Sequence, residues 1–205
     1  MRTMKSTEKF VQFVKGECKK HKVKFKPYKR RYIKLSDFIK CGGFFADGTD
    51  EQFPKPVLAF AGGHKDYLEL LVHEYCHMTQ WLDNIPIWRK ANDSLEEIDK
   101  WLAGKEVENI DECINASRDL ELDNEKRSVE MIKKWNLPID TSEYTKKANA
   151  YVLFYNYMKT SRKWSLPGNS PYTNKEILLN MSDKFDMNYE KLDLAIEQVY
   201  KEQNI

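Results

Sequence analysis

The sequence predicts an α+β protein in which a short, twisted mixed sheet precedes a larger set of helices. Short apolar and period-two stretches bounded by glycine or proline, which are typical of strands, gather between residues 23 and 61. Helical periodicity of apolar residues dominates from residue 66 onward. We expect a single domain over 1–205, with an N-terminal helix and sheet (1–64), central helices (65–136) and a C-terminal helical cap (137–205).

The composition is that of an ordinary globular protein. Hydrophobic residues make up 41% of the chain, and 34 basic against 32 acidic residues give a net charge of +2. Nothing in this balance demands a nucleic-acid or membrane partner. The four cysteines contain no C-x-x-C pair, and no apolar signal segment follows the first residues. These features predict reduced thiols and a cytoplasmic location.

The first third of the chain is predicted to hold one helix and four strands. The helix begins at Ser6 or Thr7 and continues to about His21. The strands are expected at 23–26, 32–35, 41–46 and 57–61, the first two paired across a turn that contains Pro27. Gly42-Gly43 should form a turn or bulge. The fourth strand directly precedes the helix described next, so its backbone could pair with an extended substrate.

Basic residues are concentrated in one segment. Residues 19–34 hold nine lysines and arginines, interleaved with apolar and aromatic residues. The simpler interpretation is a solvated strand face, since lysine-rich edges also discourage strand-to-strand aggregation. The alternative is an electrostatic patch for nucleic acid or an acidic protein partner.

The central feature is an H-E-x-x-H motif, His73-Glu74-Tyr75-Cys76-His77, inside a helix expected over 66–83. His73 and His77 lie one turn apart on one face, so both imidazoles can bind one metal ion. Glu74 is turned about 100° from His73, which directs its carboxylate to a water on the metal rather than to the metal itself. Two imidazoles, a further ligand, an open position and a base are the components of a catalytic Zn²⁺ site.

The third ligand is expected on a later helix. Further helices are predicted at 95–102, 110–136, 143–163, 174–181 and 188–201. On a helical wheel of 110–136, Glu121 and Glu125 fall in the middle of an apolar stripe. Buried carboxylates are costly unless they are paired or bound to metal, so one of the two is the expected third ligand. Glu125 is favoured because it is central, and the other glutamate would bond a ligand histidine or Arg118.

The helix over 143–163 is rich in aromatic residues. Tyr151 and Tyr155 share a face, and a tyrosine close to the metal can stabilise the tetrahedral oxyanion of amide hydrolysis. The simpler interpretation is that these rings belong to the core.

The H-E-x-x-H helix followed by a helix with an inward glutamate resembles the gluzincin metallopeptidases, and the chain resembles small phage-encoded proteins described as metallopeptidases. The stretches that carry the resemblance are 41–45, 73–81, 121–128 and 148–151. The resemblance implies a zincin-like core, in which a short twisted sheet packs with the active-site helix and a glutamate helix. If the chain is phage-encoded, the expected cytoplasmic location is the cytoplasm of the host.

The sequence therefore predicts a zinc-dependent hydrolase, a metallopeptidase that cleaves amide bonds of a peptide or protein. Zn²⁺ held by His73, His77 and either Glu125 or Glu121 would activate water, with Glu74 as the general base. The alternative is a non-catalytic protein with the same fold that binds a protein or nucleic acid through residues 19–34.

Overall fold

The computed structural model describes residues 5–36, 40–166 and 168–205. The chain is an α+β protein with seven α-helices and a small mixed sheet in this described part. It divides into two compact units, and each consists of two stretches of sequence. Unit 1 comprises Met1–Asp83 and Glu130–Ile139, and unit 2 comprises Asn84–Val129 and Asp140–Ile205. No helix in the described ranges combines the length and apolar content needed to cross a membrane.

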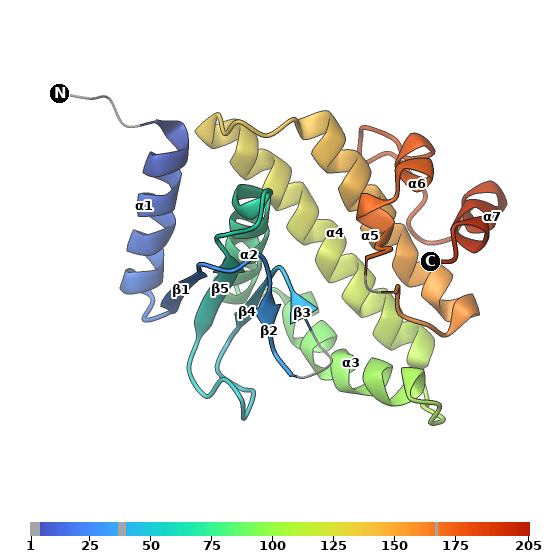
Figure 1. The fold of residues 1–205 in the computed structure, drawn as a ribbon. Coiled ribbons are helices and arrows are strands. Elements are labelled where there is room, and N and C mark those ends of the chain that lie inside the picture. The colour runs from blue at the N-terminus through green and yellow to red at the C-terminus, as the bar shows by residue number, and fades with distance from the viewer. Residues whose placement is uncertain (1–4, 37–39, 167) are drawn as a thin grey trace. The chain divides into compact units, whose positions relative to one another are not determined.

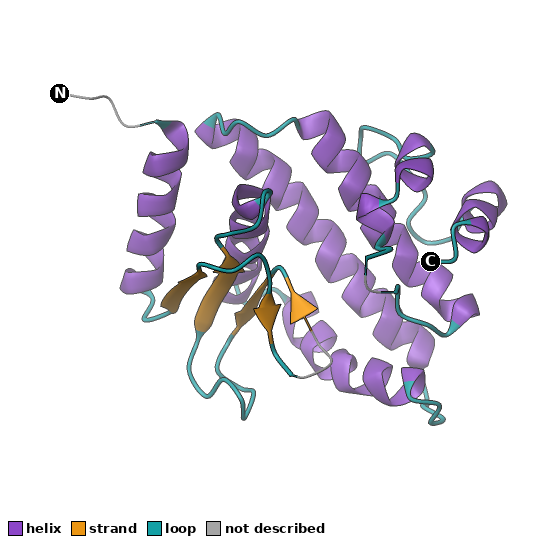
Figure 2. Ribbon diagram, in the orientation of Figure 1, coloured by secondary structure: helices purple, strands orange, loops and turns teal. Residues whose placement is uncertain are grey.

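Unit 1 contains all the strands that the structure describes (Figures 1 and 2). Its elements, in chain order, are α1 (Ser6–Lys20), β1 (Lys24–Tyr28), β2 (Ile33–Lys34), β3 (Lys40–Cys41), β4 (Gly43–Ala46), β5 (Val57–Ala61) and α2 (Tyr67–Leu82). The predicted N-terminal helix, the strand at β5 and the motif helix are confirmed to within two residues. Gly42 separates β3 from β4, as expected for a glycine pair that interrupts a strand.

The predicted pairing of the first two strands is wrong. β1 pairs in parallel with β5, Lys24 opposite Val57, while β2 pairs antiparallel with β3. Pro27 lies inside β1 rather than in a turn. A proline is tolerated there because β1 is an edge strand, where one side of the backbone needs no partner.

β5 is the central strand of the three-stranded sheet, with order β1-β5-β4. β4 pairs with it antiparallel on the side opposite β1. Both edges of the β5 backbone are therefore used by neighbouring strands, so the expectation that β5 pairs with an extended substrate is wrong. β4 is the other edge strand of this sheet.

Aromatic rings form much of the core of unit 1. Phe10 and Phe13 of α1 contact Tyr75 of α2, at ring-centroid distances of 6.2 and 5.6 Å. Phe13 also lies 4.7 Å from the ring of Trp135, in the stretch of unit 1 that comes later in the chain. Tyr75 belongs to the H-E-x-x-H helix and lies on the face of α2 that is opposite to the two histidines. This packing therefore fixes α2 from the side that does not carry the histidines.

Unit 2 is helical. It contains α3 (Pro86–Leu102), most of α4 (Ile110–Trp135), α5 (Thr141–Ser161), α6 (Lys175–Leu179) and α7 (Leu194–Glu202). α3 begins nine residues earlier than the predicted start at Leu95, because Pro86 occupies its first turn, where the missing N–H costs nothing. α7 begins later than predicted, since Asp193 caps it by accepting from the backbone N–H of Ala195.

The core of unit 2 forms around α5. Leu153, Phe154 and Met158 are buried, and Tyr200 of α7 donates a hydrogen bond to the carbonyl of Ala150 at 2.7 Å. Asp140 caps α5 by accepting from the N–H groups of Ser142 and Glu143. The aromatic helix is therefore a core helix along most of its length.

Candidate metal centre

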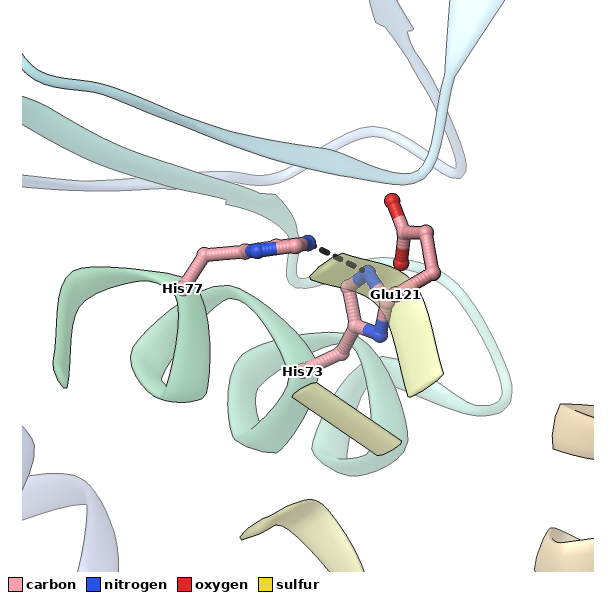
Figure 3. Close-up of side chains that lie close together, drawn as sticks. All are labelled: His73, His77 and Glu121. Carbon is pink, nitrogen blue, oxygen red and sulfur yellow. Dashed lines mark hydrogen bonds between the residues drawn. The ribbon is translucent and has the colours of Figure 1, made fainter. Parts of the chain in front are cut away.

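The H-E-x-x-H helix places its two histidines as the motif predicts. Nε2 of His73 and Nε2 of His77 lie 3.2 Å apart, with the rings nearly perpendicular (Figure 3). A tetrahedral zinc ion with Zn–N bonds of about 2.05 Å separates two ligand nitrogens by about 3.3 Å. The two imidazoles thus already have the spacing of two ligands on one metal ion.

Gln80 fixes the tautomer of His77. Its Oε1 lies 2.8 Å from Nδ1 of His77, and because an amide oxygen can only accept, Nδ1 must carry the proton. Nε2 of a neutral His77 then has a lone pair directed towards His73. A buried acceptor on the second ring nitrogen is the usual companion of a metal-binding histidine, and Gln80 is fully buried.

Glu74 lies on the buried side of α2, against the sheet. It is 5% exposed, and a Cβ added to Gly43 of β4 would lie 2.7 Å from its Oε1. Glycine at this position therefore makes the space that the carboxylate occupies. Burial, and then the charge of Glu74, raise the pKa of the Cys41 thiol to about 11. Gly43 of β4 and Cys41 of β3 are thus two of the residues near Glu74.

In unit 2, the two predicted glutamates have different surroundings. Glu125 is buried at 6% exposure, whereas Glu121 is partly exposed. Arg118 is buried but bonds neither glutamate, so of the two predicted partners of the second glutamate, a ligand histidine or Arg118, the Arg118 alternative is wrong. Its guanidinium instead donates to Asp119, Asn115, Asn156 and Glu190.

Tyr151 and Tyr155 lie close to Glu121 within unit 2. Their hydroxyl oxygens are 3.3 Å apart. Burial raises the pKa of both phenols, and the negative charge of Glu121 raises each of them further. Both hydroxyls therefore stay protonated at neutral pH and remain hydrogen-bond donors.

His73, His77 and Glu121 each offer one ligand atom, and these atoms all lie within 4.8 Å of one another (Figure 3). Glu125 is not a member of this group. Two imidazole nitrogens and a carboxylate oxygen form a donor set that suits catalytic zinc, so the residues present fit the predicted metal. Cys76, inside the motif, is fully buried and does not belong to the group.

Neither Gln80 nor Gly43 was predicted to take part in the site, although Gly42-Gly43 was expected to form a turn or bulge. A signal for Gln80 existed, because residues three apart on a helix are neighbours and Gln80 follows His77 by three. Gly43 carried no comparable signal, since its closeness to Glu74 depends on how β4 pairs with β5 and packs on α2.

Comparison of the chain with family models, with curated proteins and with solved structures finds no match. The chemistry of these residues is therefore the basis on which a function can be assigned.

Proposed function

We propose that this chain is a zinc-dependent hydrolase, specifically a metallopeptidase with a zincin-like fold. One observation carries the proposal: the Nε2 atoms of His73 and His77 are 3.2 Å apart while Gln80 holds the proton of His77 on Nδ1. Neutral imidazoles so close together, with at least one lone pair directed inward, suit a cation between them. The packing of α2 on β5 and β4 within unit 1 supports the fold assignment.

Glu121 is our candidate for the third ligand. Its carboxylate groups with the two histidine nitrogens within 4.8 Å. Glu125 comes one turn later on the same helix, at the right spacing for a supporting role on the same face. This choice reverses the preference that the helical wheel gave, because the wheel ranks residues by their angle alone.

Glu74 is the proposed general base. A bound zinc ion supplies a Lewis acid that activates water and polarises the carbonyl of the bond to be cleaved. Glu74 takes the proton of the attacking water and passes it to the leaving amine nitrogen as the C–N bond breaks. Its burial against Gly43 restricts the carboxylate to a narrow range of positions.

The tyrosine pair is the proposed oxyanion stabiliser. A neutral hydroxyl of Tyr151 or Tyr155 can donate to the carbonyl oxygen as negative charge develops on it. The edge strand β4 is the proposed docking strand for the substrate backbone, because Gly43 brings it beside Glu74. A peptide in extended conformation is therefore the expected substrate class.

Metal analysis of purified protein and matched variants tests the proposal. We expect about one zinc per chain in the wild type and in Glu74→Gln, because Glu74 is not a ligand. Glu121→Gln should lose most of the zinc, whereas Glu125→Gln should keep it. The reverse result for the two glutamates would move the ligand to Glu125, and zinc that survives His73→Ala together with His77→Ala would refute the site.

Cleavage of a peptide library separates a hydrolase from a zinc-binding protein without activity. We expect the wild type to cleave and Glu74→Gln to be inactive while it still contains zinc. Equal cleavage by both proteins would exclude Glu74 as the base. Absence of cleavage by zinc-loaded wild type across the library would favour the non-catalytic alternative.

A further inference from the structure

Unit 1 carries a strongly basic surface that the proposed hydrolysis does not use. Residues 19–34 contain nine of the 34 basic residues of the chain and none of its 32 acidic residues. The rest of the chain, with 25 basic and 32 acidic residues, is therefore net negative. We define the basic surface by its exposed cations and two rings: Lys22, Lys24, Lys29, Arg30, Arg31, Lys34, Lys40, Tyr28 and Tyr32.

A lysine lies over each of the two aromatic rings of this surface. Nζ of Lys26 is 4.7 Å from the ring centre of Tyr28, and Nζ of Lys40 is 4.8 Å from that of Tyr32. Tyr32 is 46% exposed, so its ring is accessible to a binding partner. The surface thus offers a ring face and positive charges at the same place.

The backbone beneath these side chains is firmly held. The N–H of Gly63 donates to the carbonyl of Arg30 at 3.1 Å, and a Cβ on Gly63 would lie 2.6 Å from the carbonyl oxygen of Lys29. Ile33 is 2% exposed and pairs with Cys41 between the two short strands β2 and β3. The cations and Tyr32 therefore extend from a loop that is already held in place. Binding of a partner would not have to include the entropic cost of ordering this loop.

Five of these cations form no ion pair within the described part of the chain. Among the residues that the structure describes, no carboxylate forms an ion pair with Lys22, Lys24, Lys29, Arg30 or Arg31. Lys20 and His21 at the end of α1 differ, because they lie near Glu17. Cations that lack an ion-pair partner repel one another, so binding an anionic partner would reduce this electrostatic repulsion.

We propose that the basic surface binds single-stranded nucleic acid, with phosphates on the lysines and arginines and a base stacked on Tyr32. Proteins that hold single strands combine a basic groove with aromatic platforms, because every base has a stacking face. An anionic membrane would instead favour several exposed apolar side chains. In the described part of segment 19–34, Tyr32 is the one large hydrophobic side chain that is exposed.

Fluorescence anisotropy of a labelled oligothymidylate, titrated with the full chain at several salt concentrations, tests this proposal. If five cations contact phosphates, a fourfold rise in salt should weaken binding by about 100-fold. The triple variant Lys29→Ala, Arg30→Ala, Arg31→Ala should lower the slope of log affinity against log salt by about 2. The matched control Lys175→Ala, Lys184→Ala, Lys191→Ala removes the same charge from exposed positions of unit 2 and should leave the slope unchanged.

Stacking has its own pair of variants. Tyr32→Phe should retain the affinity, whereas Tyr32→Ala should weaken it by about tenfold, the loss of one base stack. Binding should persist after metal removal with a chelator and in Glu74→Gln. The nucleic-acid proposal can therefore fail while the hydrolase proposal stands, and the reverse also holds.

Three results would overturn the inference. The first is no saturable binding at low salt. The second is an equal loss of affinity in the two triple variants, which would indicate a response to net charge alone. The third is equally tight binding to vesicles containing phosphatidylserine, with no difference between Tyr32→Phe and Tyr32→Ala, which would indicate a general surface for polyanions.

Discussion

Replacing Gln80 by methionine should weaken zinc binding without unfolding the protein. Methionine has nearly the volume of glutamine but offers no oxygen to Nδ1 of His77, now 2.8 Å from Oε1. In the metal-free protein, this neutral hydrogen bond contributes about 0.5–1.5 kcal/mol. When His77 binds zinc, its N–H becomes more acidic, so the bond approaches the 1.5–3 kcal/mol of a charge-assisted one.

The hydrogen bond from His77 to Gln80 is thus stronger in the zinc-bound protein than in the metal-free protein. The difference is the contribution to zinc binding that Gln80→Met removes. It amounts to about 1–2 kcal/mol, or about 5- to 30-fold in the dissociation constant for zinc. This agrees with the 10- to 100-fold commonly seen when the outer partner of a ligand histidine is lost. Because Gln80 is fully buried, water cannot readily substitute for its carbonyl.

Competition with a chromophoric chelator near neutral pH measures this constant, and circular dichroism of the metal-free proteins checks the fold. Gln80→Glu retains an acceptor and should bind zinc at least as tightly as the wild type does. Gln198→Met, on the exposed side of α7, is the matched control and should change nothing. Wild-type affinity in a folded Gln80→Met protein would refute the role of Gln80.

Three further predictions concern Gly43, the tyrosine pair and Cys18. Gly43→Ala should abolish hydrolysis while zinc is retained, and it should lower the free energy of unfolding in urea by about 1–3 kcal/mol. The reason is that the added Cβ would lie 2.7 Å from Oε1 of Glu74 and 3.0 Å from the carbonyl oxygen of Ala59. In the control Gly16→Ala the added Cβ meets nothing within 4 Å, so neither effect is expected. Of Tyr151→Phe and Tyr155→Phe, at least one should lower kcat/KM about 100-fold with zinc content unchanged, and full activity in both would remove the tyrosines from the mechanism. Burial raises the pKa of the Cys18 thiol from 9.0 to about 12, so the unfolded chain loses that proton first and stability falls as the pH rises through this interval. Between pH 9 and pH 12, the urea midpoint of unfolding should therefore fall further in the wild type than in Cys18→Ala. An equal fall in the two proteins would show that burial of the Cys18 thiol does not cause the loss of stability.

The parts of the fold that depend on local sequence could be predicted. α2 is found within one residue of its expected ends, because its apolar periodicity and the stop before Pro86 are both properties of neighbouring residues. His73, Glu74 and His77 take their relative positions from the helix itself. The buried stripe that contains Glu125 likewise follows from the wheel of α4.

The parts that depend on partners distant in sequence could not. The alternation in β1 indicates a strand but not whether its neighbour is β2 or β5. Pro86 ends one helix and begins the next, and the sequence signal for the two events is the same. The grouping of Glu121 rather than Glu125 with the two histidines depends on tertiary packing, which an angle about a helix axis does not contain.

The parallel pairing of β1 with β5 has a consequence for the order of folding. β4 and β5 are joined by the ten residues 47–56, whereas Lys24 of β1 must close a loop of more than 30 residues to reach Val57. Since longer closures lose more chain entropy before any contact forms, we expect the β4–β5 pair and α2 to assemble early and β1 to dock late. The basic segment on either side of β1 would then be the last part of unit 1 to become ordered as the chain folds. Its amide hydrogens should accordingly become protected after those of α2 in a pulse-labelled refolding experiment.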